Sequence, residues 1–243
     1  MDAVVGLLRA ERHAEMHAAI DPIERPRSLT ETVTERLRAL IVSGELALGQ
    51  ILSERQLGDA LGVSKTPVRE ALAQLRVEGL VRIIPQKGAM VFTLSAREVV
   101  EICELRQTLE AAALKHAFER NRATLVQGLV AATERMRAAR GRGDVRDYLA
   151  ADTAFHQVFF ATCGNGLLAE VYNLYNGKIA ALRTHLAGKP QHTEKSFEEH
   201  LLMVEALDKG EIRSAEKILD KHIDRTRTTY SSEIEDIAAA DRS

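Results

Sequence analysis

Apolar residues recur at helical spacing in three segments between residues 28 and 77. This spacing places them on one face of a helix, so each segment has a stripe that is expected to be buried. The stripes are Val33, Leu37, Leu40 and Ile41 in the first segment, Leu57, Ala60 and Leu61 in the second, and Val68, Ala71, Leu72 and Leu75 in the third. The pattern predicts three helices.

The residues between the stripes predict where the helices begin. Ser53, with Gln56 three residues later, matches a capping box for the second helix. Thr66 followed by Pro67 suits the cap and the first position of the third helix. Gly62 lets the chain turn between these two helices, which are therefore joined by a tight turn.

Apolar runs rich in β-branched residues replace the helical spacing after residue 79. The runs "LVRII" and "AMVFTL", separated by "PQKG", predict a β-hairpin. Three helices followed by a hairpin form the layout of a winged helix-turn-helix, in which the second helix of the pair enters the major groove of DNA.

Amphipathic segments follow from Ser95 onward and begin near residues 96, 122, 144, 166, 193 and 211. They are separated by breaks such as "GRGD", "CGNG", "GKP" and "DKG". We predict a mainly α protein, with a winged helix-turn-helix over residues 28–95 and an antiparallel all-α bundle of six to seven helices over residues 96–243. Residues 1–27 end in "DPIERPRS", whose prolines disfavour a continuous helix, and are predicted to form an N-terminal arm.

The composition fits a two-domain protein without a membrane span. The 243 residues are 45% hydrophobic and 28% charged. No run of about 18 apolar residues is present, and the N-terminus is charged where a secretory signal would be apolar. Cys103 and Cys163 lie in helical patterns without paired spacing, so we expect reduced core thiols in a cytoplasmic protein.

Positive charge is concentrated on the predicted winged helix-turn-helix. The net charge of the whole chain is −2, which excludes a general polyanion binder. From Arg55 to Lys87, however, six basic residues outnumber three acidic ones. Lys65 and Arg69 lie one turn apart, away from the buried stripe, and Arg76 continues that side. This charge pattern predicts contact with double-stranded DNA. The alternative is that these side chains form a solvated surface with no binding role.

Four polar residues of the helical half fall on stripes that are expected to be buried. Asp152 and His156 lie one turn apart among three phenylalanines, and His200 and His222 lie on the inner stripes of two later segments. Asp152 could simply be the hydrogen-bond partner of His156. Four such groups from three helices are costly to bury unpaired, however, and three imidazoles with one carboxylate form a ligand set for zinc or a similar divalent ion.

The N-terminal half resembles a known family. The stretch "SGELALGQILSERQLGDALGVSKTPVREALAQLRVEGLVRIIPQKGAMV" resembles the DNA-binding domain of the GntR family of bacterial transcription regulators. The resemblance implies that the residues meeting DNA are Arg55, Ser64, Lys65, Thr66, Arg69, Lys87 and Gly88. Lys65 stands where the family usually has arginine, and lysine lacks the fork that reads guanine bidentately.

The C-terminal half resembles the FCD effector-binding domain of the FadR subfamily of these regulators. The resemblance lies in the D-x-x-x-H pair, in "FEEH" at residues 197–200 and in "AEKILDKHI" at residues 215–223. It implies that a divalent metal at the floor of a cavity is bound by Asp152, His156, His200 and His222. Nitrogen and oxygen ligands suit zinc, our first expectation, and also nickel, manganese or iron.

Two arginines of this half are candidates for effector binding. Arg106 lies on an inner helical face, where an unpaired guanidinium is unfavourable. The resemblance implies that it holds the carboxylate of a small organic acid, for which the guanidinium fork is suited. The alternative is an internal salt bridge, for instance to Glu110. Arg183, on a face with Ile179, is a second candidate.

These features together predict a ligand-responsive DNA-binding transcriptional regulator that acts as a repressor. A homodimer would place two winged helices on a palindromic operator, and a small carboxylate effector would favour an arrangement of helices that no longer fits DNA. One alternative is the same DNA-binding protein with the metal as the signal or as a structural staple. Another is a metal-dependent enzyme; the DNA-binding module and the lack of an evident general base argue against it.

Overall fold

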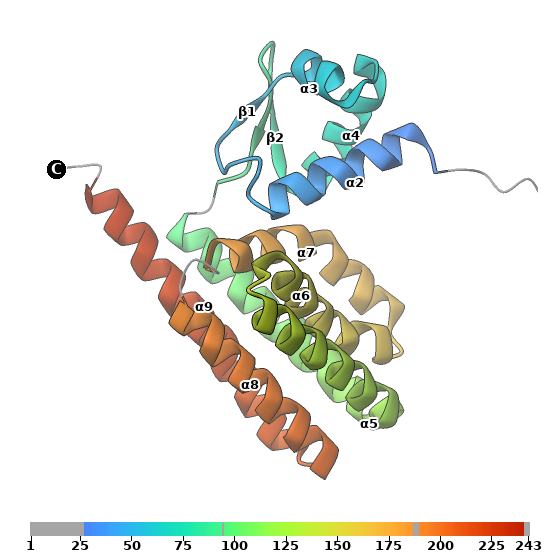
Figure 1. Ribbon diagram of the computed structural model, residues 1–243, viewed down its shortest axis with the longest axis vertical. Helices are drawn as coiled ribbons and strands as arrows, with labels where there is room; N and C mark the ends of the chain where they lie inside the picture. The colour runs from blue at the N-terminus through green and yellow to red at the C-terminus, as the bar shows by residue number, and fades with distance from the viewer. Residues whose placement is uncertain (1–26, 94, 187–189, 241–243) are drawn as a thin grey trace, which may run out of the picture.

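The computed structural model describes residues 27–93, 95–186 and 190–240, with side chains described except at 185–191 and 231–240. The arm predicted for residues 1–27 lies outside the described residues, apart from Arg27. Figure 1 shows a small N-terminal module above a bundle of longer helices. The predicted fold class, a mainly α protein with an N-terminal winged helix-turn-helix, is confirmed.

Three helices and a small sheet make up the N-terminal module. The elements are α2 (Leu29–Val42), β1 (Ile51–Leu52), α3 (Glu54–Leu61), α4 (Lys65–Val77), β2 (Val81–Ile84) and β3 (Gly88–Val91). The antiparallel sheet has the order β1-β3-β2. The hairpin β2–β3 is the predicted one, whereas β1 was not predicted because two residues are too few to show a pattern. The apolar stripe of α4 is buried as predicted.

The predicted N-cap of α3 is confirmed, whereas its capping box and the predicted cap of α4 are wrong. Ser53 is the N-cap of α3, but its side chain makes no capping hydrogen bond, so the capping box is not formed. The helix α4 begins at Lys65 with Ser64 as its N-cap, which places Thr66 and Pro67 inside the first turn. A cap depends on the backbone angles at the helix start, which residue types alone do not determine.

The inner face of α3 also differs from the prediction. Ala60 is exposed, while Gly58 is buried. A Cβ atom on Gly58 would lie 2.9 Å from the carbonyl oxygen of Val63, so the turn between α3 and α4 closes directly over this glycine. The tight turn therefore packs on Gly58, where no side chain obstructs it, and Ala60 faces solvent.

Five long helices form the C-terminal bundle in the described part of the chain. They are α5 (Ala96–Arg142), α6 (Val145–Thr162), α7 (Gly166–Leu186), α8 (Pro190–Lys209) and α9 (Ile212–Ala240). Asn121 interrupts α5 with non-helical angles (φ −142°, ψ 41°), so the two starts predicted near residues 96 and 122 are halves of one kinked element. The Asn121 side chain donates a hydrogen bond to the Thr162 carbonyl at 2.8 Å, which ties the kink to the end of α6.

The core of the bundle lies where α5 packs against α6, α8 and α9. Cys103 and Cys163 are free, buried thiols in this core, as predicted. Val145 is 57% exposed because it occupies the first position of α6. None of the helices in the described part of the chain has both the length and the apolar character needed to cross a bilayer.

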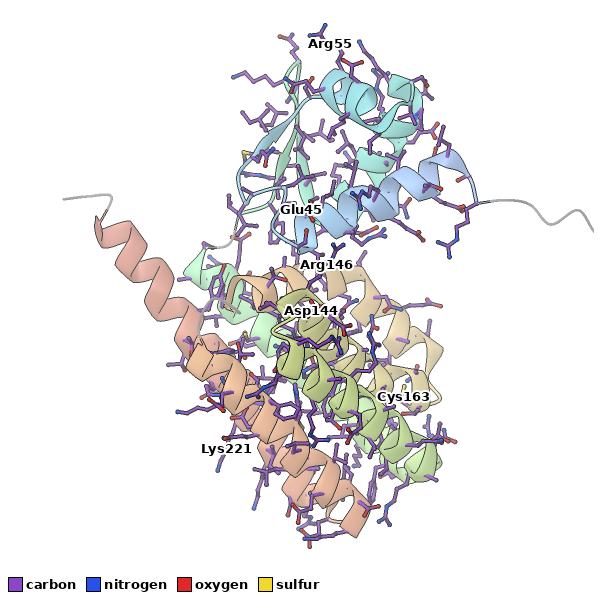
Figure 2. All side chains as sticks on the ribbon, in the orientation of Figure 1. Glu45, Arg55, Asp144, Arg146, Cys163 and Lys221 are labelled. Carbon is purple, nitrogen blue, oxygen red and sulfur yellow. The ribbon has the colours of Figure 1, made fainter. Side chains whose placement is uncertain are left out.

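Helix α7 connects the two modules. It packs against α2 (Figure 1). Ala181 of α7 is buried in the hydrophobic core of the N-terminal module. A Cβ atom on Gly177 would lie 2.8 Å from Leu80 Cδ1, so the helix and the start of the hairpin approach closely. Beside this contact, a groove of about 1270 Å³ is lined from both modules, with Glu45 on one side and Arg146 on the other (Figure 2).

Candidate DNA-binding face and candidate metal centre

The residues expected to meet DNA lie together at the end of the N-terminal module. Arg55 lies on α3, far from the bundle (Figure 2), and Lys65 and Arg69 project from α4. Lys87 lies in the turn of the wing between β2 and β3. The side chains of this face are exposed, namely Arg55, Ser64, Lys65, Thr66, Arg69 and Lys87. Exposed cations at the start of the second helix of the pair are placed to contact a major groove.

Gly88, the last residue of the predicted DNA-contacting set, has a structural reason to be glycine. Its φ of +106° is in a region that side chains disfavour, and a Cβ atom there would lie 2.2 Å from the Leu52 carbonyl oxygen. Glycine at this position therefore permits the pairing of β1 with β3. Its contact with DNA stays a prediction.

Three of the four residues expected to bind metal converge inside the bundle. His156, His200 and His222 come from α6, α8 and α9, and one ring nitrogen from each lies within 4.8 Å of the others. All three are buried, with relative exposures of 0%, 0% and 3%. Nitrogen ligands of a tetrahedral zinc ion are about 3.3 Å apart for bonds of about 2.0–2.1 Å. Small side-chain shifts would complete such a set.

Asp152, the fourth expected ligand, lies beside this cluster but is paired with another residue. Its Oδ1 is 3.8 Å from Nδ1 of His200, whereas its Oδ2 is 3.1 Å from Nε of Arg183. The Oδ2–Nε contact is an ion pair without hydrogen-bond geometry. Asp152 therefore neutralises Arg183 in this arrangement.

Two carboxylates orient the rings of two of the histidines by hydrogen bonding to their Nδ1 atoms. Glu110 lies 2.7 Å from Nδ1 of His156, and Glu199 lies 2.8 Å from Nδ1 of His222. A carboxylate accepts the proton on Nδ1, which leaves Nε2 with a free lone pair. The Nε2 of His156 is buried without a hydrogen-bond partner, and so are both ring nitrogens of His200.

Sequence reasoning missed the role of these two carboxylates. The sequence suggests Glu110 only as a salt-bridge partner of Arg106, and it gives Glu199 in "FEEH" no role. Glu110 could have been found as a second inward-facing charge one turn after Arg106. Glu199 carried no such signal, because it reaches His222 from a different helix.

Burial keeps the histidines neutral. Desolvation lowers the pKa of His156 to about 3 and that of His200 well below 6.5, and it also lowers the pKa of His222. Burial would raise the pKa of Glu110, but Arg106 and His156 outweigh it and lower that pKa well below 4.5. At neutral pH the imidazoles are therefore neutral, the form in which they bind metals, and the ionised Glu110 can accept the Nδ1 proton of His156.

The two candidate effector arginines are buried in the same region. Arg106 is fully buried, and its Nε donates to Glu110 at 2.8 Å, so the internal salt bridge considered as an alternative is formed. Arg183 is 8% exposed and pairs with Asp152. The terminal nitrogens of both guanidinium groups have no hydrogen-bond partners. The salt bridge thus satisfies only part of Arg106. Nη2 of Arg183 lies 3.9 Å from Oε1 of Glu110, an ion pair without a hydrogen bond.

A small cavity lies between these groups. Its lining includes Arg106, Asp152, Arg183 and His222, and its volume is about 20 Å³. This volume suffices for a water molecule or an ion but not for an organic acid. The donor set fits a divalent metal, because an ion would satisfy imidazole nitrogens that are otherwise buried without partners.

Both modules match described protein families. Residues 29–91 match the model of "Bacterial regulatory proteins, gntR family", and residues 101–225 match the model of the FCD domain. A protein named "Probable D-xylose utilization operon transcriptional repressor" from Paenarthrobacter nicotinovorans is 30% identical over 79% of this chain and 86% of its own. The gluconate operon transcriptional repressor of Bacillus subtilis (strain 168) is 27% identical over 72% and 74% of the two chains.

Solved structures share the fold. A GntR regulator from Rhodococcus sp. RHA1 has a TM-score of 0.75 at 21% identity and covers 84% of this chain and 97% of its own. E. coli McbR/YncC has a TM-score of 0.72 at 23% identity, with coverages of 84% and 100%. The two family matches together span both modules, and the relatives are regulators rather than enzymes. This chain therefore belongs to the GntR family of bacterial regulatory proteins, with an FCD domain as its C-terminal part, and is a DNA-binding transcriptional regulator.

Proposed function

We propose that this regulator is a homodimeric repressor of the FadR subfamily that binds a palindromic operator. A divalent metal and a small organic acid, both bound in the FCD domain, control its affinity for this operator. The observation that carries the proposal is the cluster of neutral, buried histidines, in which ring nitrogens of His156 and His200 lack hydrogen-bond partners, beside two guanidinium groups whose terminal nitrogens also lack them. Groups of this kind are costly to bury unless a ligand completes them.

The metal would be held by His156, His200 and His222, with Asp152 as the fourth ligand once it turns from Arg183. Three nitrogens and one oxygen suit zinc, and they also accept nickel, manganese or iron. When bound, the ion supplies a Lewis acid that attracts a carboxylate oxygen. The chain's own contribution is orientation, because Glu110 and Glu199 hold two of the rings with Nε2 free.

The charges of the centre favour an anionic effector. The positive charges of Arg106 and Arg183 are balanced by the negative charges of Glu110 and Asp152. A divalent ion adds two positive charges to this balanced set, and a carboxylate ligand would offset them. The cavity of about 20 Å³ must open for such a ligand to enter. Opening would shift the helices that hold these side chains, among them α7, which also packs against the DNA-binding module.

The names of relatives support repression, whereas the homodimer is proposed from symmetry. Relatives with similar sequences are named transcriptional repressors of sugar-related operons. A dimer with two-fold symmetry would present two copies of α4 to half-sites of the same symmetry. A differential affinity of about 1–3 kcal/mol between the two helix arrangements would give a typical allosteric response.

The small cavity also favours a second candidate function, in which the metal alone is the signal or a structural staple. A volume of about 20 Å³ beside Asp152 and His222 leaves no room for an organic acid. In this case DNA affinity would depend on metal, and organic acids would have no effect.

One experiment separates the two functions. DNA from the promoter of the protein's own operon is used in gel-shift titrations with chelated protein, with zinc-loaded protein, and with zinc-loaded protein plus candidate organic acids. The first function predicts that at least one acid weakens binding of the loaded protein. The second predicts that chelation alone changes binding.

Two variants serve as controls for this experiment. His200→Ala removes a ligand and should abolish the metal response, whereas His116→Ala, which removes a histidine outside the cluster, should leave it unchanged. If zinc does not bind the wild-type protein and neither metal nor acid alters its DNA affinity, both functions are wrong.

A further inference from the structure

An acidic side chain lies within the basic face that is expected to meet DNA. Glu54 is the first residue of α3, and Arg69 projects from the exposed side of α4. Nε and Nη2 of Arg69 both donate to Oε2 of Glu54, at 3.1 and 2.9 Å, and Nε also lies 3.3 Å from Oε1. The carboxylate thus accepts hydrogen bonds from the Nε–Nη2 edge of the guanidinium group.

This carboxylate needs an explanation, because a negative charge on a DNA-binding face repels phosphates. The hydrogen bonds from Arg69 lower the pKa of Glu54, so the carboxyl group is ionised at neutral pH. Folding stability is a weak reason for the pair. Arg69 is 71% exposed at its side chain, and exposed ion pairs contribute little to stability.

The geometry of the pair offers a better reason. A guanidinium group has five N–H donors, and Glu54 occupies those on the Nε side. The end edge, with Nη1 and the outer hydrogen of Nη2, stays free. Two parallel donors of this kind match the O6 and N7 acceptors of guanine in the major groove. Holding the long side chain in one position also lowers the entropy cost of ordering it on DNA.

We infer that Glu54 is a positioning residue for base recognition, which holds Arg69 so that its end edge reads a guanine in each half-site. The inference rests on the proposed DNA-contacting role of Arg69 and adds to it the partner that aims the side chain. Lys65, on the same helix, lacks a fork and provides charge without this directional reading.

The test uses a pool of randomised DNA duplexes, because it requires no prior operator. The full-length wild-type protein, Glu54→Gln, Glu54→Ala and Arg69→Ala are each used to select duplexes, and the affinity for the enriched duplex is compared with that for its single-base substitutions. The wild type should prefer guanine at one position of each half-site. Both Glu54 variants should reduce that preference about tenfold, while their non-specific binding is retained or increased because a negative charge is lost.

Asp59→Asn is the matched control, since it removes one negative charge from the exposed side of the same helix and should leave the base preference unchanged. Arg69→Ala should abolish the preference, and Glu54→Ala combined with Arg69→Ala should match Arg69→Ala alone. If Arg69→Ala abolishes the preference but neither Glu54 variant reduces it, the positioning role is overturned and Arg69 still reads DNA. If Arg69→Ala also keeps the preference, the DNA-reading role of Arg69 is wrong as well. Thermal unfolding checks that each variant is folded, and Glu54→Gln serves if the alanine variant is not.

Discussion

The DNA-binding face and the buried centre of the FCD domain both consist of charged and polar side chains, but they are held in place in different ways. On α4, Lys65 and Arg69 are exposed, and the contact that holds Arg69, its ion pair with Glu54, lies at the surface as well. In the bundle, Arg106 and Glu110 are fully buried and must satisfy each other. An exposed charge is therefore replaceable without harm to the fold, whereas a buried charge is part of the fold.

One helix belongs to both regions. Ala181 of α7 is buried in the core of the N-terminal module, and Arg183, two residues later, pairs with Asp152 in the buried centre. A ligand that separates Arg183 from Asp152 acts on the helix against which the DNA-binding module rests. Because α7 belongs to both regions, substitutions in the buried centre should alter three measurable quantities. These are the stability of the fold, the affinity for metal and the affinity for DNA.

The largest effect is expected from Glu110→Ala. The change leaves Arg106 with a buried charge and no partner, which costs about 3–5 kcal/mol in the free energy of unfolding. Chemical denaturation of the metal-free protein measures it. The control Glu205→Ala removes one partner of the exposed Glu205–Lys209 pair and should change stability little. Similar effects of the two variants would contradict the contrast between buried and exposed charges.

The next largest effect is expected from pH. The folded-state pKa of His156 is about 3 and that of His200 is well below 6.5, so the unfolded chain binds more protons than the folded chain below about pH 6.5. Stability from these groups is fully present above that pH and is lost as pH falls toward the folded-state values. For two histidines the loss between pH 7.5 and 5.5 amounts to about 2–3 kcal/mol. Denaturation curves of metal-free protein across this range measure it, and a constant stability would contradict neutral, buried histidines.

A smaller effect, on metal binding, is expected from Glu199→Gln. Glutamine is neutral and orients the Nδ1 of His222 less firmly, so zinc affinity should fall about 10–100-fold. Competition with a chromophoric chelator measures the affinity. Glu198→Gln alters the neighbouring carboxyl group and should have no effect; equal losses in both variants would remove the orienting role of Glu199.

The smallest effect is expected on the exposed face. Lys65→Ala should weaken DNA binding about equally for all sequences and lower the dependence of log affinity on log salt concentration by about 1. Its melting temperature should stay that of the wild type, because the side chain is exposed. Fluorescence anisotropy over a salt series measures the slope. A loss of base preference in this variant would show that Lys65 reads bases as well.

Most of the helices and the hairpin could be predicted because apolar spacing reports directly which face is buried. The details that failed depended on backbone geometry or on contacts distant in sequence. The cap of α4 is Ser64 rather than Thr66 because the turn after Gly62 sets where helical angles begin. Ala60 is exposed because the following turn packs on Gly58.

The metal-ligand candidates could be chosen from the sequence because a histidine on an apolar stripe has one direction in which to point. His156, His200 and His222 meet in the structure as that argument expects. The partners behind them could not be chosen in this way. Glu199 reaches His222 across 23 residues of chain, and the spacing of residues within one helix carries no information about contacts between helices.

The order of the elements, the inward-facing polar residues and the family can be read from the amino-acid sequence, because helical periodicity and short motifs are local properties. Which charges neutralise each other depends on the packed fold, since Asp152 and Arg183 come from different helices. The packed fold also decides how much space is left between them, about 20 Å³. Both depend on how the helices pack, and packing is a property of the whole bundle rather than of any one segment.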